Sequence, residues 1–261
     1  MQFRLKLARG IVRLGNFISS LALMVLRRDD LMEYTRQNYL TENQVSSYSQ
    51  EDFVDSGLNR EETLLLEKLP LTAGRLLVLG MGGGRDAIAL ARRGFQVVGA
   101  DYIPAMVTQA LKNAERGGVA LEGVVQDLAD IRMSAASFDA VILFAGMYSA
   151  IPGREGRIAL LKRVRDILTP QGYFLCQFFY EEHHTSYRWA EWVRQAVAFV
   201  SQGYLTYEPG DALFGGREFL HFFNSQEELT GEFAAGGFQV VDLYLSGNLS
   251  GAVLQAGAEA K

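Results

Sequence analysis

The 261-residue chain contains one cysteine, Cys176, and only three histidines. A single cysteine excludes an internal disulfide bond and any metal site built from several thiolates. Cys176 lies in the apolar run 173–178, so we expect a small buried side chain there rather than a nucleophile. This cysteine usage is typical of a reducing, intracellular compartment, and we expect a cytoplasmic protein.

The chain also lacks an excess of positive charge, since 25 Lys and Arg stand against 30 Asp and Glu and the formal net charge is -5. Neutralising nucleic-acid phosphates requires clustered Lys and Arg, so we exclude nucleic acid as a general partner. We expect no metal site either, because the adjacent His183 and His184 rarely direct both rings at one ion. With 49% apolar and 21% charged residues, the composition is that of a globular protein with a sizeable core.

Acidic residues are missing from one segment, residues 1–28. The basic residues of this segment are Arg4, Lys6, Arg9, Arg13, Arg27 and Arg28. At about 100° per residue, its apolar side chains fall on one face of a helix. The apolar run 17–26 is shorter than the roughly 20 residues of a spanning helix. Two interpretations remain open: a helix packed on its own domain or on a second subunit of a homodimer, which we place first, or a basic amphipathic helix on an anionic membrane surface.

The rest of the chain divides into a polar segment, 29–70, and a longer unit, 71–261. The first predicts a helical cap, with Asn59 capping a helix over 59–68 that Pro70 ends. The second alternates strands and helices, which predicts an α/β fold with βαβ crossovers and a parallel sheet covered on both faces. Two late strands, 238–243 and 250–257, predict an antiparallel hairpin. An inserted helix over 184–200 predicts a helical lid over about 181–224.

A glycine-rich loop follows the first predicted strand of this unit, in the sequence LLVLGMGGGRD. In open α/β sheets, ligands bind at such a loop, beyond the carboxyl end of a strand and near a helix N-terminus. Gly80 and Gly82 match the start of the dinucleotide fingerprint, but Arg85 occupies the position that needs a small residue. The spacing is instead Gly80-x-Gly82-x-Gly84, which disfavours a dinucleotide.

Acidic residues end the next two predicted strands. Asp101 closes Val97-Val98-Gly99-Ala100-Asp101, where a carboxylate can accept both hydroxyl groups of a ribose. Asp127 closes the third strand and can accept a hydrogen bond from an adenine amino group, while Leu128 offers its backbone N–H. An ordinary loop acid is the alternative for Asp127. Asp130 lies close by and could be either the adenine contact or the loop acid.

These motifs, in this order and spacing, resemble class I S-adenosylmethionine-dependent methyltransferases over about residues 76–179. The resemblance rests on GMGGG, VVGAD with Tyr102-Ile103-Pro104-Ala105-Met106, VVQD, FDAVILFAG and LTPQGYF. It implies a seven-stranded, mostly parallel sheet with a C-terminal antiparallel hairpin, and S-adenosylmethionine as cofactor. It implies cofactor contacts at Gly80, Met81, Gly82, Gly84, Asp101, Tyr102, Met106, Asp127, Leu128, Phe144 and Ala145.

The chain departs from this family at Val78, where an acidic residue often stands two positions before the first loop glycine. The departure leaves open which group holds the cofactor's ammonium. The backbone carbonyls of Phe144 and Ala145, or the side chain of Asp86, are the alternatives. Arg85, Tyr34 and Tyr39 are the alternatives for its carboxylate.

Methyl transfer from a sulfonium is an in-line displacement, in which the protein mainly aligns the reacting groups and excludes water. Where a base is needed, we place His183 or His184 first and Glu181 next, because they follow the fifth strand at the carboxyl edge of the sheet. His221, flanked by aromatic residues, stands behind them, and a buried structural histidine is the alternative there.

The acceptor is constrained mainly by what is missing. No Asn/Asp-Pro-Pro-aromatic motif follows the fourth strand, and aromatic residues are dense over 173–223, so we expect a small, apolar or lipid-like acceptor methylated at O or N. The alternatives are a non-catalytic S-adenosylmethionine-binding or interaction protein of the same fold and, behind it, an NAD(P)-dependent oxidoreductase.

Overall fold

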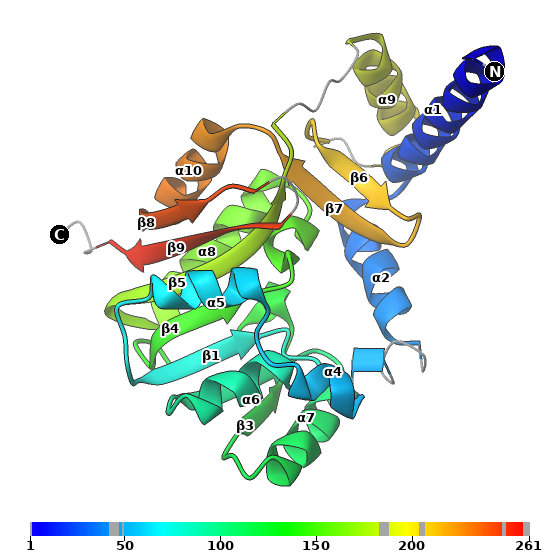
Figure 1. Ribbon diagram of the computed structural model, residues 1–261. Helices are drawn as coiled ribbons and strands as arrows, with labels where there is room; N and C mark the ends of the chain where they lie inside the picture. Colours follow the sequence, from blue (N-terminus) through cyan, green and yellow to red (C-terminus); the bar gives the residue numbers. More distant parts are fainter. Residues whose placement is uncertain are drawn as a thin grey trace.

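The computed structural model describes residues 2–41, 47–48, 50–182, 188–203, 207–246 and 249–257, which form an α/β fold around one mixed sheet (Figure 1). The sheet order is β3-β2-β1-β4-β5-β7-β6, with β9 paired to β5 and β8 paired to β9. The strands are β1 (Arg75–Leu79), β2 (Gln96–Asp101), β3 (Glu122–Val125), β4 (Phe138–Leu143), β5 (Leu168–Tyr180), β6 (Asp211–Phe214), β7 (Glu218–Phe223), β8 (Phe238–Tyr244) and β9 (Leu249–Ala256).

The predicted parallel sheet and the antiparallel C-terminal hairpin are confirmed. Strands β1 to β5 pair in parallel, and β9 runs antiparallel to both β5 and β8. The crossovers are the helices α6 (Arg85–Arg92), α7 (Pro104–Arg116) and α8 (Arg154–Ile167), and α10 (Gln226–Ala235) precedes the hairpin. The point at which the order reverses, between β1 and β4, places the loops after these strands side by side.

Alternate side chains of β1 enter different hydrophobic cores, as the pleat of a strand requires. Leu77 and Leu79 join the core beneath α8 and α10, whereas Leu76 and Val78 join the core beneath α6 and α7. Helix α5 (Arg60–Glu67) closes the second core with Leu65. Asn59 caps α5 by accepting a hydrogen bond from the Glu62 backbone N–H at 2.8 Å, which confirms the predicted cap.

The sheet has nine strands rather than the expected seven. The two additional strands, β6 and β7, lie in the segment that the sequence assigns to a helical lid. Only α9 (Arg188–Ser201) is helical there among the described residues, and β7 extends the sheet by pairing Phe222 with Phe179. Residues 219–223 are nearly all buried and follow the turn glycines Gly215 and Gly216, which connect β6 to β7.

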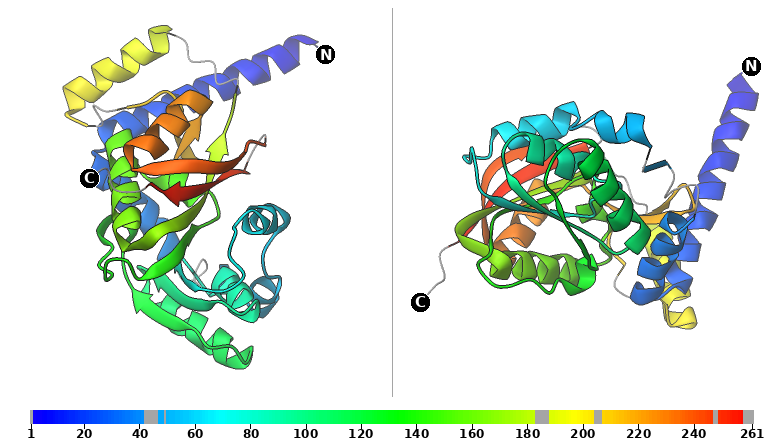
Figure 2. Two further views of the ribbon diagram at one scale, coloured as in Figure 1. Left: turned by 90° about the vertical axis from the view of Figure 1, so that its left-hand side faces the viewer. Right: turned by 90° about the horizontal axis from the view of Figure 1, so that it is seen from below.

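The N-terminal helices lie at one side of the sheet. Helix α1 (Gln2–Val25) projects from the body with α9 beside it, and α2 (Arg28–Tyr39) leads back toward the sheet before α4 (Glu51–Asp55) (Figures 1 and 2). Near the C-terminal end of α1, Leu23 and Met24 are buried against Ala198 of α9 and Phe219 of β7. Among the described helices, none combines the length and the apolar character needed to cross a membrane.

Candidate functional site

The glycine loop after β1 turns sharply beside the end of β2. Gly80, Gly82 and Gly84 have φ angles of +67°, +53° and +95°, which favour glycine. The Asp101 carboxylate accepts a hydrogen bond from the Gly82 backbone N–H and another from the Ile103 N–H, each at 2.9 Å. Burial raises the pKa of Asp101. The Tyr102 backbone N–H also interacts with this carboxylate. Because a carboxylate offers about four acceptor positions, at least one remains for a ligand held between the loop and β2.

The side chains of Met81 and Met106, two of the expected cofactor contacts, lie in the protein interior. Met81 and Met106 are almost fully buried, and a side chain on Gly99 would collide with the Met81 sulfur. Their side chains are therefore core groups, and only the Met81 backbone belongs to the loop surface. Tyr102 is half-buried at the end of β2, and burial raises its pKa to about 12.

Helix α2 closes over the ends of β2 and β3 through Arg36. The Arg36 guanidinium pairs with the Asp127 carboxylate and lies 5.6 Å from the centre of the Tyr102 ring. Asp127 also accepts a hydrogen bond from the Ala129 N–H at 2.9 Å, which begins the short 3-10 turn that contains Leu128. Sequence reasoning misses Arg36, because nothing in a polar helical segment marks one arginine as the partner of a carboxylate 91 residues away.

The loop after β4 is held in an unusual conformation by β5. Ala145 has a φ of +56°, and its backbone N–H donates to the Gln177 side-chain oxygen at 2.9 Å. Gln177 is fully buried, and its Nε2 finds no hydrogen-bond partner among the described residues. A buried amide nitrogen without a partner beside this loop indicates a place for an acceptor atom of a ligand. The signal in the sequence was a lone amide within the apolar strand 173–179.

Val78, the departure from the family pattern, is a core residue with 1% of its surface exposed. The charge at this end of the loop is supplied instead by Arg85, Asp86 and Glu62. Arg85 donates to both Glu62 carboxylate oxygens at 2.5 and 2.8 Å and pairs with Asp86 at 2.6 Å. Two carboxylates around one guanidinium leave an excess negative charge. Burial and the nearby Glu62 raise the pKa of Asp86 to about 7.

The groups considered for the cofactor's carboxylate all have protein partners. Arg85 is engaged by Glu62, Tyr34 donates to the Gly216 carbonyl at 2.5 Å, and Tyr39 donates to Glu218 at 2.6 Å. The Tyr39 bond ties α2 to β7. These tyrosines therefore anchor the N-terminal cap to the additional strands.

The candidate bases fall into two sets. His183 and His184 lie outside the described residues, while Glu181 is exposed directly after β5, where its N–H donates to the Phe223 carbonyl at 2.8 Å. His221 is 1% exposed, and its Nδ1 lies 2.7 Å from an oxygen of Asp211. Its Nε2 has no hydrogen-bond partner among the described residues.

His221 borders a buried polar network that joins α8, α10 and the segment before β6. The fully buried Arg157 donates to Glu232 at 2.6 and 2.9 Å and to Glu208 at 2.8 Å. Tyr148 donates to Glu232 at 3.0 Å. Glu208, Asp211 and His221 lie close enough for a metal ion, but Arg157 already neutralises Glu208, so this charge pattern favours a structural network.

A mostly parallel sheet in the order 3-2-1-4-5, with a glycine loop tied to an acid at the end of β2, defines the class I S-adenosylmethionine-dependent methyltransferase fold. Residues 76–172 match the family model described as a methyltransferase domain. A solved S-adenosylmethionine-dependent methyltransferase from Methanosarcina mazei superposes with a TM-score of 0.59 at 18% identity, covering 78% of this chain and all of the other. Residues 76–172 thus match a methyltransferase domain, and the chain has the fold of class I S-adenosylmethionine-dependent methyltransferases.

Curated relatives match part of this chain. A ubiquinone biosynthesis O-methyltransferase of Cereibacter sphaeroides is 31% identical over 108 residues, which are 41% of this chain and 42% of the relative. A demethylmenaquinone methyltransferase of Clavibacter sepedonicus is 32% identical over 110 residues, 42% of this chain and 43% of the relative. The match thus spans less than half the length of these relatives.

The residues fit the family's cofactor, S-adenosylmethionine. Gly82 is open, since a side chain there would reach only Tyr48 at 4.0 Å, and Asp101 stands beside it with at least one free acceptor position. Gln177 Nε2, a buried polar atom without a hydrogen-bond partner among the described residues, lies beside the loop after β4, and the buried Asp86 carboxylate, paired with Arg85, lies just past the loop after β1. A ligand with ribose hydroxyls, an ammonium and a carboxylate satisfies groups of this kind.

Proposed function

We propose that this protein transfers a methyl group from S-adenosylmethionine to oxygen or nitrogen of a small, apolar or lipid-like acceptor. The observation that carries the proposal is the Asp101 carboxylate, buried and bonded to the Gly82 N–H at the switch point of the sheet. The cofactor supplies a methyl group already activated by its sulfonium. The protein therefore has to orient the two reactants and exclude water, which can lower a barrier by about 7–11 kcal/mol.

In this proposal, a residue of the chain contacts each part of the cofactor. Asp101 accepts the ribose hydroxyls, and Asp127 with the Leu128 N–H meets the adenine. Asp86 meets the ammonium in place of the missing acid at Val78, because its cluster carries the excess negative charge. Gln177 meets a carboxylate or carbonyl oxygen beside Ala145.

The acceptor lies against aromatic side chains beside the loop after β4. A side chain on Gly146 would collide with the Phe179 ring, whose centre is 5.6 Å from that of Phe222. Phe214 continues this cluster at 6.5 Å from Phe222. The matched relatives named for ubiquinone and menaquinone synthesis support an aromatic acceptor with apolar substituents. Glu181, with His183 and His184 in the same segment, is the proposed source of a base where the acceptor carries a proton.

Residues 1–28 contact a membrane surface in this proposal, rather than only their own domain. Support comes from the way α1 projects from the body: among its described side chains, the buried ones, Leu23 and Met24, lie at its C-terminal end. A homodimer through the same helix is the competing arrangement.

Calorimetric titration with S-adenosylmethionine, S-adenosylhomocysteine and NAD tests the cofactor. We expect both sulfur ligands to bind and NAD not to bind. Asp101→Ala should weaken binding about 10- to 100-fold, given about 1.5–3 kcal/mol for hydrogen bonds to a charged group. Asp166→Ala, an exposed aspartate on α8, is the matched control and should leave affinity unchanged. Binding of NAD alone, or equal affinity in Asp101→Ala, would contradict the proposed site.

A further inference from the structure

Helices α1 and α9 project from the body and belong neither to the sheet nor to its crossover helices. They lie far apart in the sequence and contact each other beside the body (Figure 2). Ser201 Oγ donates to the Met24 carbonyl at 2.9 Å and fixes the end of α9 on the end of α1. We call the outer surface of these two helices the α1–α9 face.

The α1–α9 face exposes many large apolar side chains. On α1 these are Leu5, Leu7, Ile11, Val12, Leu14 and Ile18, each more than half exposed. Of these, Leu7, Ile11, Leu14 and Ile18 are spaced as one helical stripe. On α9, Trp192, Phe199 and Val200 are 72%, 78% and 83% exposed. Exposed apolar side chains in this number, with four of them in one helical stripe, indicate an interaction surface.

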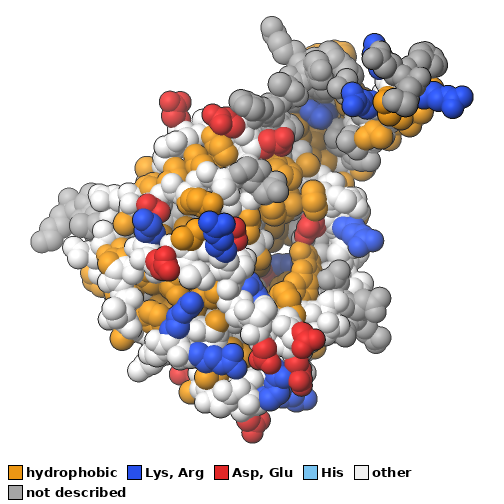
Figure 3. Space-filling model, in the orientation of Figure 1, with side chains coloured by type: hydrophobic (Ala, Val, Ile, Leu, Met, Phe, Trp, Pro, Cys, Tyr) orange, Lys and Arg blue, Asp and Glu red, His pale blue; other side chains and the backbone are white. Residues whose placement is uncertain are grey.

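The positive charge of α1 favours an anionic partner for the α1–α9 face. Helix α1 carries four Lys and Arg and no Asp or Glu, although the whole chain has a net charge of -5. Figure 3 shows Lys and Arg beside apolar side chains on this projection. A second copy of the chain meeting the α1–α9 face with its own would bring like charges together. An anionic lipid surface offers opposite charge and an apolar interior at once.

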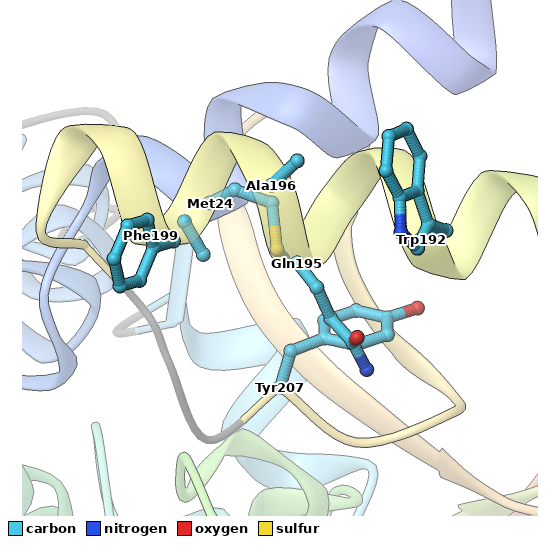
Figure 4. Close-up of a pocket in the computed structure, with 7 residues that line it drawn as sticks. Met24, Trp192, Gln195, Ala196, Phe199 and Tyr207 are labelled. Atoms are coloured by element: carbon cyan, nitrogen blue, oxygen red, sulfur yellow. The ribbon is translucent and has the colours of Figure 1, made fainter.

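A hollow opens beside α9, near the C-terminal end of α1. It measures about 370 Å³ and is lined by Met24, Trp192, Gln195, Ala196, Ala198, Phe199 and Tyr207. Figure 4 shows Trp192 and Phe199 along α9, with Met24 and Tyr207 near the space between them. Apart from the Gln195 amide, the Tyr207 hydroxyl and the indole N–H, the lining side chains are hydrocarbon and sulfur, which suits a lipid chain rather than a polar ligand.

We propose that the α1–α9 face docks on an anionic bilayer and that the hollow seats one hydrocarbon chain of a lipid. Trp192 then lies at the level of the headgroups, where amphipathic rings are favoured. The docking itself is independent of methyl transfer. That the seated chain belongs to the methyl acceptor rests on the proposed function.

Vesicle flotation of the full chain tests the docking. We expect flotation with phosphatidylcholine vesicles that contain phosphatidylglycerol, weaker flotation with phosphatidylcholine alone, and loss of binding at high salt. The double variant Trp192→Glu and Phe199→Glu should lower partitioning by about tenfold or more, because each charge replaces buried apolar area. Val241→Glu, a half-exposed site on β8, is the matched control and should float like the parent chain.

A spectroscopic readout separates docking from general charge attraction. In Trp189→Phe, Trp192 is the remaining tryptophan. Its emission should shift to the blue on anionic vesicles and be quenched by lipids brominated on their chains. Unshifted emission, or equal flotation of the double variant, would overturn the proposal. If the parent chain does not float but forms a dimer that the double variant abolishes, the α1–α9 face binds a second copy of the chain. Cofactor binding is measured separately, so that a failure of the docking proposal is distinguished from a failure of the proposed cofactor site.

Discussion

At the scale of single residues, the proposed counterpart of the acid that is absent at Val78 is a different carboxylate, Asp86. Val78 lies in an aliphatic core that has no room for charge, whereas Asp86 lies just past the glycine loop in a cluster with Glu62 and Arg85. The sequence indicates Asp86 as one alternative, but it cannot show the cluster. Glu62 lies 23 residues before Arg85, and only the folded cap brings the two together.

Asp86 also makes stability depend on pH. The pKa of Asp86 in the folded protein, about 7, exceeds the ordinary aspartate pKa of 3.8. Between these two pH values the folded protein therefore holds a proton that the unfolded chain has lost. The wild-type protein therefore loses stability as pH rises from about 4 to 7. Asp86→Asn removes this loss. Denaturant unfolding at pH 5 and pH 8 should show a smaller pH difference in Asp86→Asn than in the wild type.

The same group should couple proton release to cofactor binding. An ammonium stabilises the Asp86 carboxylate, so wild-type affinity for S-adenosylhomocysteine should rise from pH 6 to pH 8 and binding should release protons. Asp86→Asn should flatten this dependence, while Asp166→Asn should retain it. Identical pH profiles in the wild type and Asp86→Asn would remove Asp86 from the ammonium site.

At the scale of elements, the helices and strands from β1 to α7 follow the sequence closely, and the segment after β5 does not. Local signals are strong in the first region: Pro104 begins α7, as expected of a proline at a first helical turn. The β6–β7 hairpin depends instead on a distant partner, because β7 pairs with the last residues of β5. Its aromatic residues fit a strand and a lid equally well until that pairing is known.

The buried network of Arg157 fixes α8 to α10 and makes a testable contribution to stability. Glu232→Gln leaves the buried Arg157 charge without its main partner, and such a loss costs about 3 kcal/mol or more. The exposed Glu227, on the same helix, provides the control: Glu227→Gln should change stability by less than about 0.5 kcal/mol. Denaturant titration gives both values. Equal stability of the two variants would show that the Arg157 pair is not needed to hold α10.

At the scale of the whole molecule, the proposed cofactor site lies in the unit 71–261, and the N-terminal helices contact this unit through Arg36 and Tyr39. The glycine loop, Asp101 and Asp127 could be predicted because their spacing follows from strand ends that meet at one sheet edge. Arg36, Gln177 and the Tyr39–Glu218 contact could not, since each depends on how the N-terminal helices and β5 pack in three dimensions. The N-terminal helices thus close the site over the sheet.

The central claim is methyl transfer to an apolar acceptor, and one measurement tests it most directly. The full chain is incubated with S-adenosylmethionine labelled in its methyl group and with a total lipid extract, and the label is followed into the organic phase. We expect label in a lipid-soluble product with the wild type, a strong reduction with Asp101→Ala, and no change with Asp166→Ala. Label that stays in the aqueous phase, although the cofactor binds, would contradict the account.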